Sequence, residues 1–150
     1  MTNYQRTANW LKACGKEPGF NVDDTSVQIG CDIEETCEFL KTLRSDSDGY
    51  AKLLERCISD LEWFANKLKK REQFVYIPVH LREEALDALC DREVTGNGVA
   101  YMAGFLKEAA DELVLASNEA KLVDGKPVIL PGGKIGKPEG WKAPDLGDCV

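Results

Sequence analysis

The sequence predicts an all-α protein: a bundle of four to five helices followed by an irregular arm. Apolar residues recur at intervals of three and four over most of residues 4–121, which is the period of a helix packed on one side. From residue 122 onward the periodicity stops, and Gly, Pro and Lys dominate. We therefore expect a single domain over residues 1–150, with the helical bundle over about 4–121 and the arm over 122–150.

The early elements alternate between helical and loop-like composition. Residues 4–14 form an amphipathic pattern, and residues 15–30 hold the Gly, Pro and Asp clusters of a loop. Asp32 then stands where an N-cap is expected, with Glu35 three positions later as in a capping box. We predict that the second helix begins there and runs to about residue 44.

Three further helices complete the predicted bundle. A long pattern over 50–71 ends in Lys and Arg, which suit a helix C-terminus. Residues 74–80 alternate and contain Pro78, and they predict a connector, or at most an edge strand. The next helix starts near Leu81, and we expect it to bend at the glycines of 96–98 before the last helix, which runs from about 106 to 121.

Composition and charge exclude several classes of protein. The formal net charge of −7 argues against sequence-independent nucleic-acid binding, which needs many Lys and Arg side chains. No apolar run is long enough to span a membrane, and no leader is apparent. The six cysteines are widely spaced and accompany a single histidine, so a zinc site has little support. We expect a cytoplasmic protein whose cysteines are reduced and mostly buried.

An acidic cluster lies in the stretch EETCEFL, which holds Glu34, Glu35 and Glu38. On a helix, Glu34 and Glu38 are neighbours of like charge, which costs a few tenths of a kcal/mol. No basic residue follows Glu34 or Glu35 at a spacing that would compensate them. The cluster is therefore either an ordinary solvated face or part of a site for a cation.

A second acidic cluster favours the interpretation of the first as part of a cation site. Glu84, Asp87 and Asp91 fall on one stripe of the predicted helix that starts near residue 81. Two helices with carboxylates at this spacing can converge on Mg²⁺, which prefers oxygen ligands. The alternative is chance, since acidic residues make up 26 of the 150.

These stretches resemble the MazG-like superfamily of all-α nucleoside triphosphate pyrophosphohydrolases, which includes the dimeric dUTPases and the phosphoribosyl-ATP pyrophosphohydrolases. EETCE resembles its E-E-x-x-E motif, and EALD its E-x-x-D motif. DALCD followed by VTGNGVAYMAGF, and the tail SNEAKLVDGKPVILPGGKIGKPEGWKAPDL, are similar to its phage and bacterial branch. The similarity covers about residues 22–44 and 81–146, and the tail is its most specific part.

The resemblance implies particular metal ligands. Glu35 and Glu38 match the first ligand pair, and Glu34 the outer glutamate. On the later helix two registers stay open, so the ligands implied there are Glu84, Asp87 and Asp91. The cofactor implied is Mg²⁺, with Mn²⁺ as a substitute. Glu34 or Glu35 would orient or deprotonate the attacking water.

The same resemblance implies a substrate and a state of assembly. Asn118 and Lys121 match a polar pair that meets phosphates. Lys126, Lys134 and Lys137 of the arm are candidates to reach them, and solubilising loop charges are the alternative. The reaction implied is hydrolysis of a nucleoside triphosphate to the monophosphate and pyrophosphate. A homo-dimer or homo-tetramer is expected, without nucleic acid or membrane as a partner.

The chain also departs from the family pattern. The two motifs are usually joined by a short connection, whereas 45 residues separate Glu38 from Glu84 here. One alternative is therefore a non-catalytic acidic helical binding protein or inhibitor that retains the fold, and another is a hydrolase of a signalling nucleotide. Among the tryptophans, we expect Trp10 and Trp63 in the core and Trp141 packing the arm onto the bundle.

Overall fold

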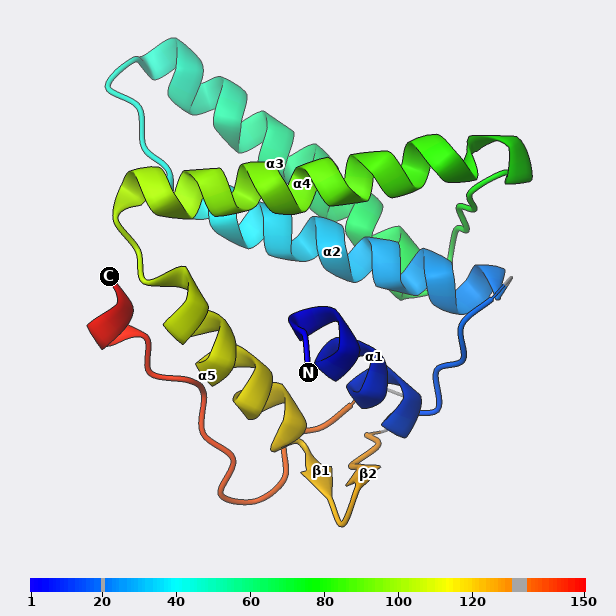
Figure 1. Ribbon diagram of the computed structural model, residues 1–150. Coiled ribbons are helices and arrows are strands. Elements are labelled where there is room, and N and C mark those ends of the chain that lie inside the picture. Colours follow the sequence, from blue (N-terminus) through cyan, green and yellow to red (C-terminus); the bar gives the residue numbers. More distant parts are fainter. Residues whose placement is uncertain (20, 131–134) are drawn as a thin grey trace. The chain divides into compact units, whose positions relative to one another are not determined.

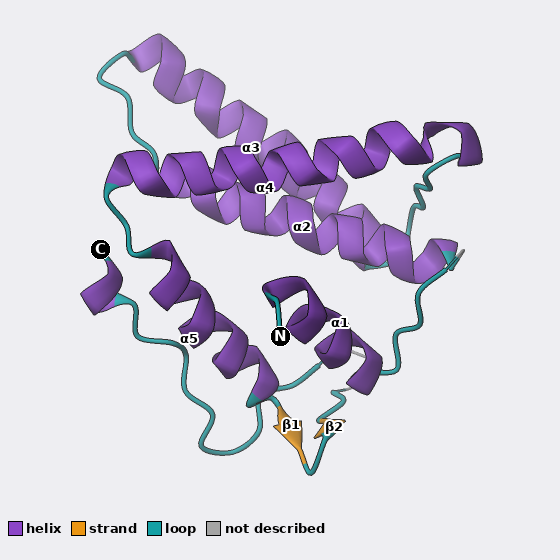
Figure 2. Ribbon diagram, in the orientation of Figure 1, coloured by secondary structure: helices purple, strands orange, loops and turns teal. Residues whose placement is uncertain are grey.

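The computed structural model describes residues 1–19, 21–130 and 135–150, which are mostly helical (Figures 1 and 2). The described chain falls into two compact units, Pro18–Val79 and Met1–Glu17 with His80–Val150. The predicted all-α class is confirmed, and the prediction of a single domain stays a prediction. No helix among the described residues is both long and apolar enough to cross a membrane. The described residues form five α-helices: α1 (Asn3–Ala13), α2 (Val22–Thr42), α3 (Asp48–Lys69), α4 (Arg82–Ala103) and α5 (Lys107–Glu119).

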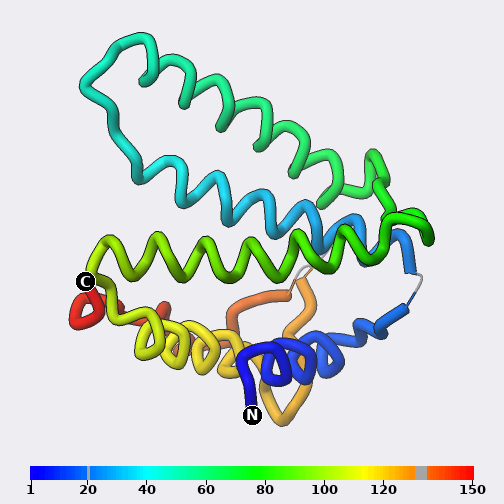
Figure 3. Tube along the Cα trace, turned by 45° about the horizontal axis from the view of Figure 1, so that its top comes forward, coloured from blue at the N-terminus to red at the C-terminus, as the bar shows by residue number. Residues whose placement is uncertain are grey.

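The unit Pro18–Val79 is a helical hairpin made of α2 and α3, which Figure 3 shows as consecutive coils joined by a short connection. Its core is a seam of buried residues at three- and four-residue spacing, which is the geometry of two helices packed along their length. On α2 the buried residues are Ser26, Gly30 and Cys37; on α3 they are Ala65 and Leu68.

The helix α2 starts ten residues earlier than the sequence predicted, at Val22 rather than near Asp32. The side chain of Asn21 accepts a hydrogen bond from the amide of Asp24 at 3.1 Å and so caps the helix. Arg71 forms ion pairs with Asp23 (3.4 Å) and Asp24 (2.9 Å) in the first turn. Asp32 is therefore inside the helix, and the predicted capping box at residues 32–35 is wrong.

The segment that follows α3 is hydrogen-bonded to α2. The hydroxyl of Ser26 is fully buried and accepts a hydrogen bond from the amide of Val75 at 3.1 Å. Residues 74–78 contain no strand or helix, as predicted for the connector, and a short 3₁₀ turn at Val79–Leu81 precedes α4. A buried hydroxyl with a partner avoids the cost of an unsatisfied polar group.

In the other unit, α5 is the helix that most elements contact. Arg6 of α1 pairs with Glu112 at 2.5 Å and with Glu119 at 2.8 Å, and both acids lie on α5. The fork of the guanidinium meets both oxygens of Glu119, a geometry that suits arginine. These contacts fix α1 along α5.

The helix α4 is continuous from Arg82 to Ala103, and the predicted bend at residues 96–98 is wrong. A glycine inside a helix costs about 1 kcal/mol relative to alanine but leaves every backbone hydrogen bond available. Gly104, with φ of 80°, ends the helix in the left-handed conformation that glycine adopts most readily.

The segment after α5 begins with two short antiparallel strands, β1 (Leu122–Val123) and β2 (Lys126–Pro127). Asp124 and Gly125 connect them with positive φ values of 51° and 73°, as a two-residue hairpin turn requires. Further on, the 3₁₀ turn Gly147–Cys149 returns to the start of α5, where the amide of Leu106 donates to the carbonyl of Cys149 at 2.9 Å.

Three predictions about individual side chains have mixed outcomes. The indole of Trp141 donates to the carbonyl oxygen of Ser117 on α5 at 2.9 Å, so the predicted packing of the arm is confirmed. Trp63 is 65% exposed and is not a core residue. No disulfide joins any of the six cysteines, all of which are described, but only Cys37 and Cys149 are buried, so the expectation of mostly buried thiols is wrong.

Candidate functional site

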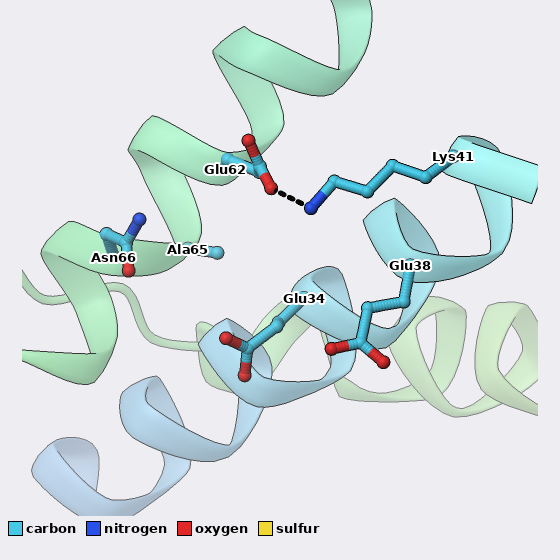
Figure 4. Close-up of a pocket in the computed structure, with 6 residues that line it drawn as sticks. All are labelled: Glu34, Glu38, Lys41, Glu62, Ala65 and Asn66. Atoms are coloured by element: carbon cyan, nitrogen blue, oxygen red, sulfur yellow. Dashed lines mark ion pairs between the residues drawn. The ribbon is translucent and has the colours of Figure 1, made fainter.

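The first acidic cluster lies on α2 beside a small pocket of the α2–α3 hairpin. Glu34 and Glu38 are one helical turn apart and both line this pocket, which has a volume of about 60 Å³. Figure 4 shows their side chains on α2, with those of Glu62, Ala65 and Asn66 on the neighbouring helix α3. The other lining residues are Lys41 of α2 and Glu62, Ala65 and Asn66 of α3.

Lysines compensate two of the acidic groups around this pocket. Lys41 forms an ion pair with Glu62, drawn as a dashed line in Figure 4, and Lys69 of α3 forms one with Glu34. The hydrogen bond that the ammonium of Lys41 donates to the carboxylate of Glu62 raises the pKa of Lys41. The cluster of Glu34, Glu35 and Glu38 is therefore not left uncompensated as a whole, because the charge that the local sequence lacks comes from α3.

The size of the pocket limits what it can hold. A volume of about 60 Å³ admits a few water molecules or one hydrated ion, because a buried water needs about 10–15 Å³ of such space. Pockets for whole small-molecule ligands are several times larger, about 300–1,000 Å³. The carboxylates of Glu34 and Glu38 and the amide of Asn66 offer the oxygen atoms that hard cations prefer.

The second acidic cluster lies on α4. Glu84, Asp87 and Asp91 are exposed and follow one stripe of this helix, as predicted. Both registers of the E-x-x-D motif stay open, because all three side chains share that stripe. Glu35 is likewise exposed, on α2.

The donor chemistry of these clusters matches Mg²⁺ or Mn²⁺, because each candidate ligand is a carboxylate. Within residues 1–19, 21–130 and 135–150, however, no three His, Cys, Asp or Glu side chains are grouped so that they could hold a metal ion. The metal therefore stays a prediction from the motifs.

The predicted phosphate-binding pair is brought together at the end of α5. The ammonium of Lys121 donates to the side-chain oxygen of Asn118 at 2.8 Å. Lys126 lies in β2 and is exposed. Lys134 lies outside the described residues.

Lys137, also a predicted candidate to reach phosphates, and Trp141 lie beside this pair. The ammonium groups of Lys121 and Lys137 lie 5.5 Å and 4.4 Å from the centre of the Trp141 ring. Sequence spacing shows only that the arm is rich in lysine. It does not show which lysine returns to the end of α5, since that depends on the path of the arm. Sequence spacing also does not show the contact of Glu62 with Lys41, because that contact depends on the register of α2 against α3.

Comparisons with protein-family models, with curated proteins and with solved structures find no match to this chain. We therefore infer the function of this chain from its motifs and from the geometry within each unit.

Proposed function

We propose that this protein hydrolyses a nucleoside triphosphate, or a related nucleotide, between the α and β phosphates, and releases the monophosphate and pyrophosphate. One observation carries the proposal: Glu34 and Glu38, the outer and last glutamates of the E-E-x-x-E motif, line one small pocket with Lys41. Acidic and basic side chains around a space the size of a few waters suit a hydrolytic reaction, in which a water is activated beside a phosphate.

The residues of the two acidic motifs have two proposed roles, as metal ligands and as the general base. On the motifs, we assign Glu35 and Glu38 of α2 as ligands of Mg²⁺, for which Mn²⁺ can substitute. Glu84, Asp87 or Asp91 of α4 match the second ligand motif. When bound, the metal neutralises charge on the phosphate oxygens. Glu34 or Glu35 accepts the proton of the attacking water, and the ion pair with Lys69 holds the Glu34 carboxylate in position.

The remaining assignments concern substrate binding, cellular location and oligomeric state. Asn118, Lys121 and Lys126 bind the phosphates of the substrate, as compact cationic and amide donors do. The protein acts in the cytoplasm, which suits a chain whose six cysteines form no disulfide. It assembles as a homo-dimer or homo-tetramer, which the exposure of Leu86 (64%), Leu89 (56%) and Val94 (68%) on α4 supports.

The test is an incubation of the purified protein with a panel of ribo- and deoxyribonucleoside triphosphates, with Mg²⁺ or with EDTA, followed by chromatography of the products. We expect monophosphate and pyrophosphate with Mg²⁺ and no product with EDTA. Diphosphate with orthophosphate would contradict the assigned bond. Absence of turnover across the panel would favour the non-catalytic binding protein or a signalling nucleotide as substrate.

A further inference from the structure

The pocket beside Glu34 and Glu38 is too small for a whole nucleotide. Its volume of about 60 Å³ is several times below that of pockets that hold small-molecule ligands, about 300–1,000 Å³. A nucleotide whose phosphates lie at this pocket, as the proposed function requires, therefore places its base on the surface beside the pocket. The side chains at the edge of the pocket decide how that base is held.

Trp63 of α3 lies at that edge. It directly follows Glu62 and precedes Asn66 by three residues, and Glu62 and Asn66 both line the pocket (Figure 4). Residues three apart on a helix are neighbours on its surface, with Cβ atoms about 5–6 Å apart. The Cβ of Trp63 is therefore about one helical turn from the pocket, on the helix that forms one of its walls.

The indole of Trp63 is open to solvent and is restrained by a neighbouring side chain. The residue is 65% exposed, whereas tryptophan is highly buried on average. The ammonium of Lys67, one helical turn along α3, stands over the ring, 5.8 Å from its centre and within the range of a cation–π contact. That ammonium also forms an ion pair with Glu72. Lys67 thus restrains the ring and leaves much of its surface free.

Exposure alone does not make a binding site, because single apolar side chains are common on protein surfaces. Tyr50, for example, is 69% exposed on the same helix but lies about 20 Å from Trp63 along the axis, at about 1.5 Å per residue. Phe39 of α2 follows Glu38 and is 46% exposed, which makes it a competing candidate. Trp63 combines a larger ring, greater exposure than Phe39 and the restraint from Lys67.

We propose that Trp63 stacks on the base of a nucleotide whose phosphates lie at the pocket beside Glu34 and Glu38. The proposal rests on the proposed function, which places the phosphates there. Stacking on an aromatic side chain tolerates every base, because each base has a π-face. The ligand is therefore a nucleotide recognised by its planar base, and any preference between bases comes from other contacts.

The test is calorimetric titration of the full chain with a panel of nucleoside monophosphates in the presence of Mg²⁺. These ligands are products of the proposed reaction, so their binding is measured without hydrolysis of the substrate bond. Ribose 5-phosphate, which has no base, reports the contribution of the sugar and phosphate alone. Trp63→Leu should weaken binding of the nucleoside monophosphates about tenfold and leave binding of ribose 5-phosphate unchanged. Trp63→Tyr keeps an aromatic ring and should retain most of the affinity.

Two further variants locate the site. Tyr50→Leu is the matched control, because it removes an equally exposed aromatic ring from the distant end of the same helix, and it should leave both affinities unchanged. Phe39→Leu tests the competing position on α2. Equal losses in Trp63→Leu and Tyr50→Leu, a loss in Phe39→Leu alone, or no binding of any nucleoside monophosphate by the natural chain would overturn the proposal. Circular dichroism checks that each variant folds, which we expect because the replaced side chains are exposed.

The product assay separates this proposal from the proposed function. Trp63→Leu should raise KM about tenfold and leave kcat unchanged, because stacking on the base is the same in the ground state and in the transition state. Nucleoside monophosphate binding that depends on Trp63, without turnover by the natural chain, would overturn the proposed function and leave this site standing. Turnover with the same KM in the natural chain and in Trp63→Leu would overturn this site alone.

Discussion

Gly30 of α2 lies so close to Ala65 of α3 that a Cβ added at residue 30 would stand 2.9 Å from the Ala65 carbonyl oxygen. The same Cβ would stand 3.0 Å from the Cβ of Leu68, which is fully buried. Carbonyl oxygens of a helix move only with the helix itself, so a side chain at position 30 forces α2 and α3 apart. The closeness of the two helices, and with it the pocket beside Glu34 and Glu38, depends on this glycine.

We therefore predict that Gly30→Ala destabilises the protein. Overpacking costs about 1–3 kcal/mol, whereas alanine gains about 1 kcal/mol in helix propensity, so the net loss is about 1 kcal/mol. The measurement is urea denaturation followed by circular dichroism. Gly96→Ala is the matched control, because a Cβ at that interior position of α4 meets no described atom within 4 Å. It should stabilise by about 0.5–1 kcal/mol. Equal effects in the two variants would contradict the close approach at Gly30.

Glu38→Gln tests the catalytic proposal. The change removes one carboxylate from the pocket while its size and shape stay nearly the same, so we expect an unchanged fold and at least a ~100-fold loss of turnover. The measurement is the rate of pyrophosphate release, with circular dichroism as the check on folding. Glu55→Gln removes an exposed acidic charge from α3 and should leave the rate unchanged. A protein that binds a partner through its overall acidity would respond equally to both changes.

Arg6→Gln tests the contact between α1 and α5 through its dependence on pH. The hydrogen bond from Arg6 lowers the pKa of Glu119 in the folded protein. A carboxylate whose pKa falls on folding stabilises the protein above its ordinary pKa, near 4.3, and that contribution disappears as the pH falls through the lowered value. The natural protein should therefore melt at a higher temperature than the variant at pH 7, and the difference should shrink below about pH 4.

Melting curves at several pH values, followed by circular dichroism, measure this difference. Lys12→Gln, on the same helix, serves as the control, because Lys12 is exposed and makes no ion pair among the described residues. A difference in melting temperature that stays constant from pH 7 to pH 3 would show that Arg6 acts through packing and not through Glu119.

The thiols should differ in reactivity. Burial raises the pKa of Cys37, which is 1% exposed, whereas Cys57 is exposed on α3. Alkylation requires both access and the thiolate, so Cys37 should react with iodoacetamide at least ~10-fold more slowly than Cys57 at pH 8. Mass spectrometry of peptides from the labelled native protein measures both rates, and labelling in urea gives the unfolded reference. Comparable rates in the native protein would contradict the burial of Cys37.

The sequence by itself determined the helical class and the positions of most helices. Apolar spacing places α3 and α5 within a few residues of their observed ends, because this spacing records which face each helix buries. It also placed Glu84, Asp87 and Asp91 on one stripe of α4, since residues three, four and seven apart on a helix lie on one side.

Only the tertiary structure decided the start of α2 and the neighbours of its acidic cluster. The ten residues before Asp32 are loop-like in composition but helical in the structure. The buried hydroxyl of Ser26 has its partner in the amide of Val75, and Gly30 allows the close approach of α3, and neither contact is visible in the local sequence. Likewise, Lys69 lies 35 positions from Glu34 and meets it only in the folded hairpin. Contacts between distant residues depend on how helices pack and in which register, and a local pattern of residue types contains neither.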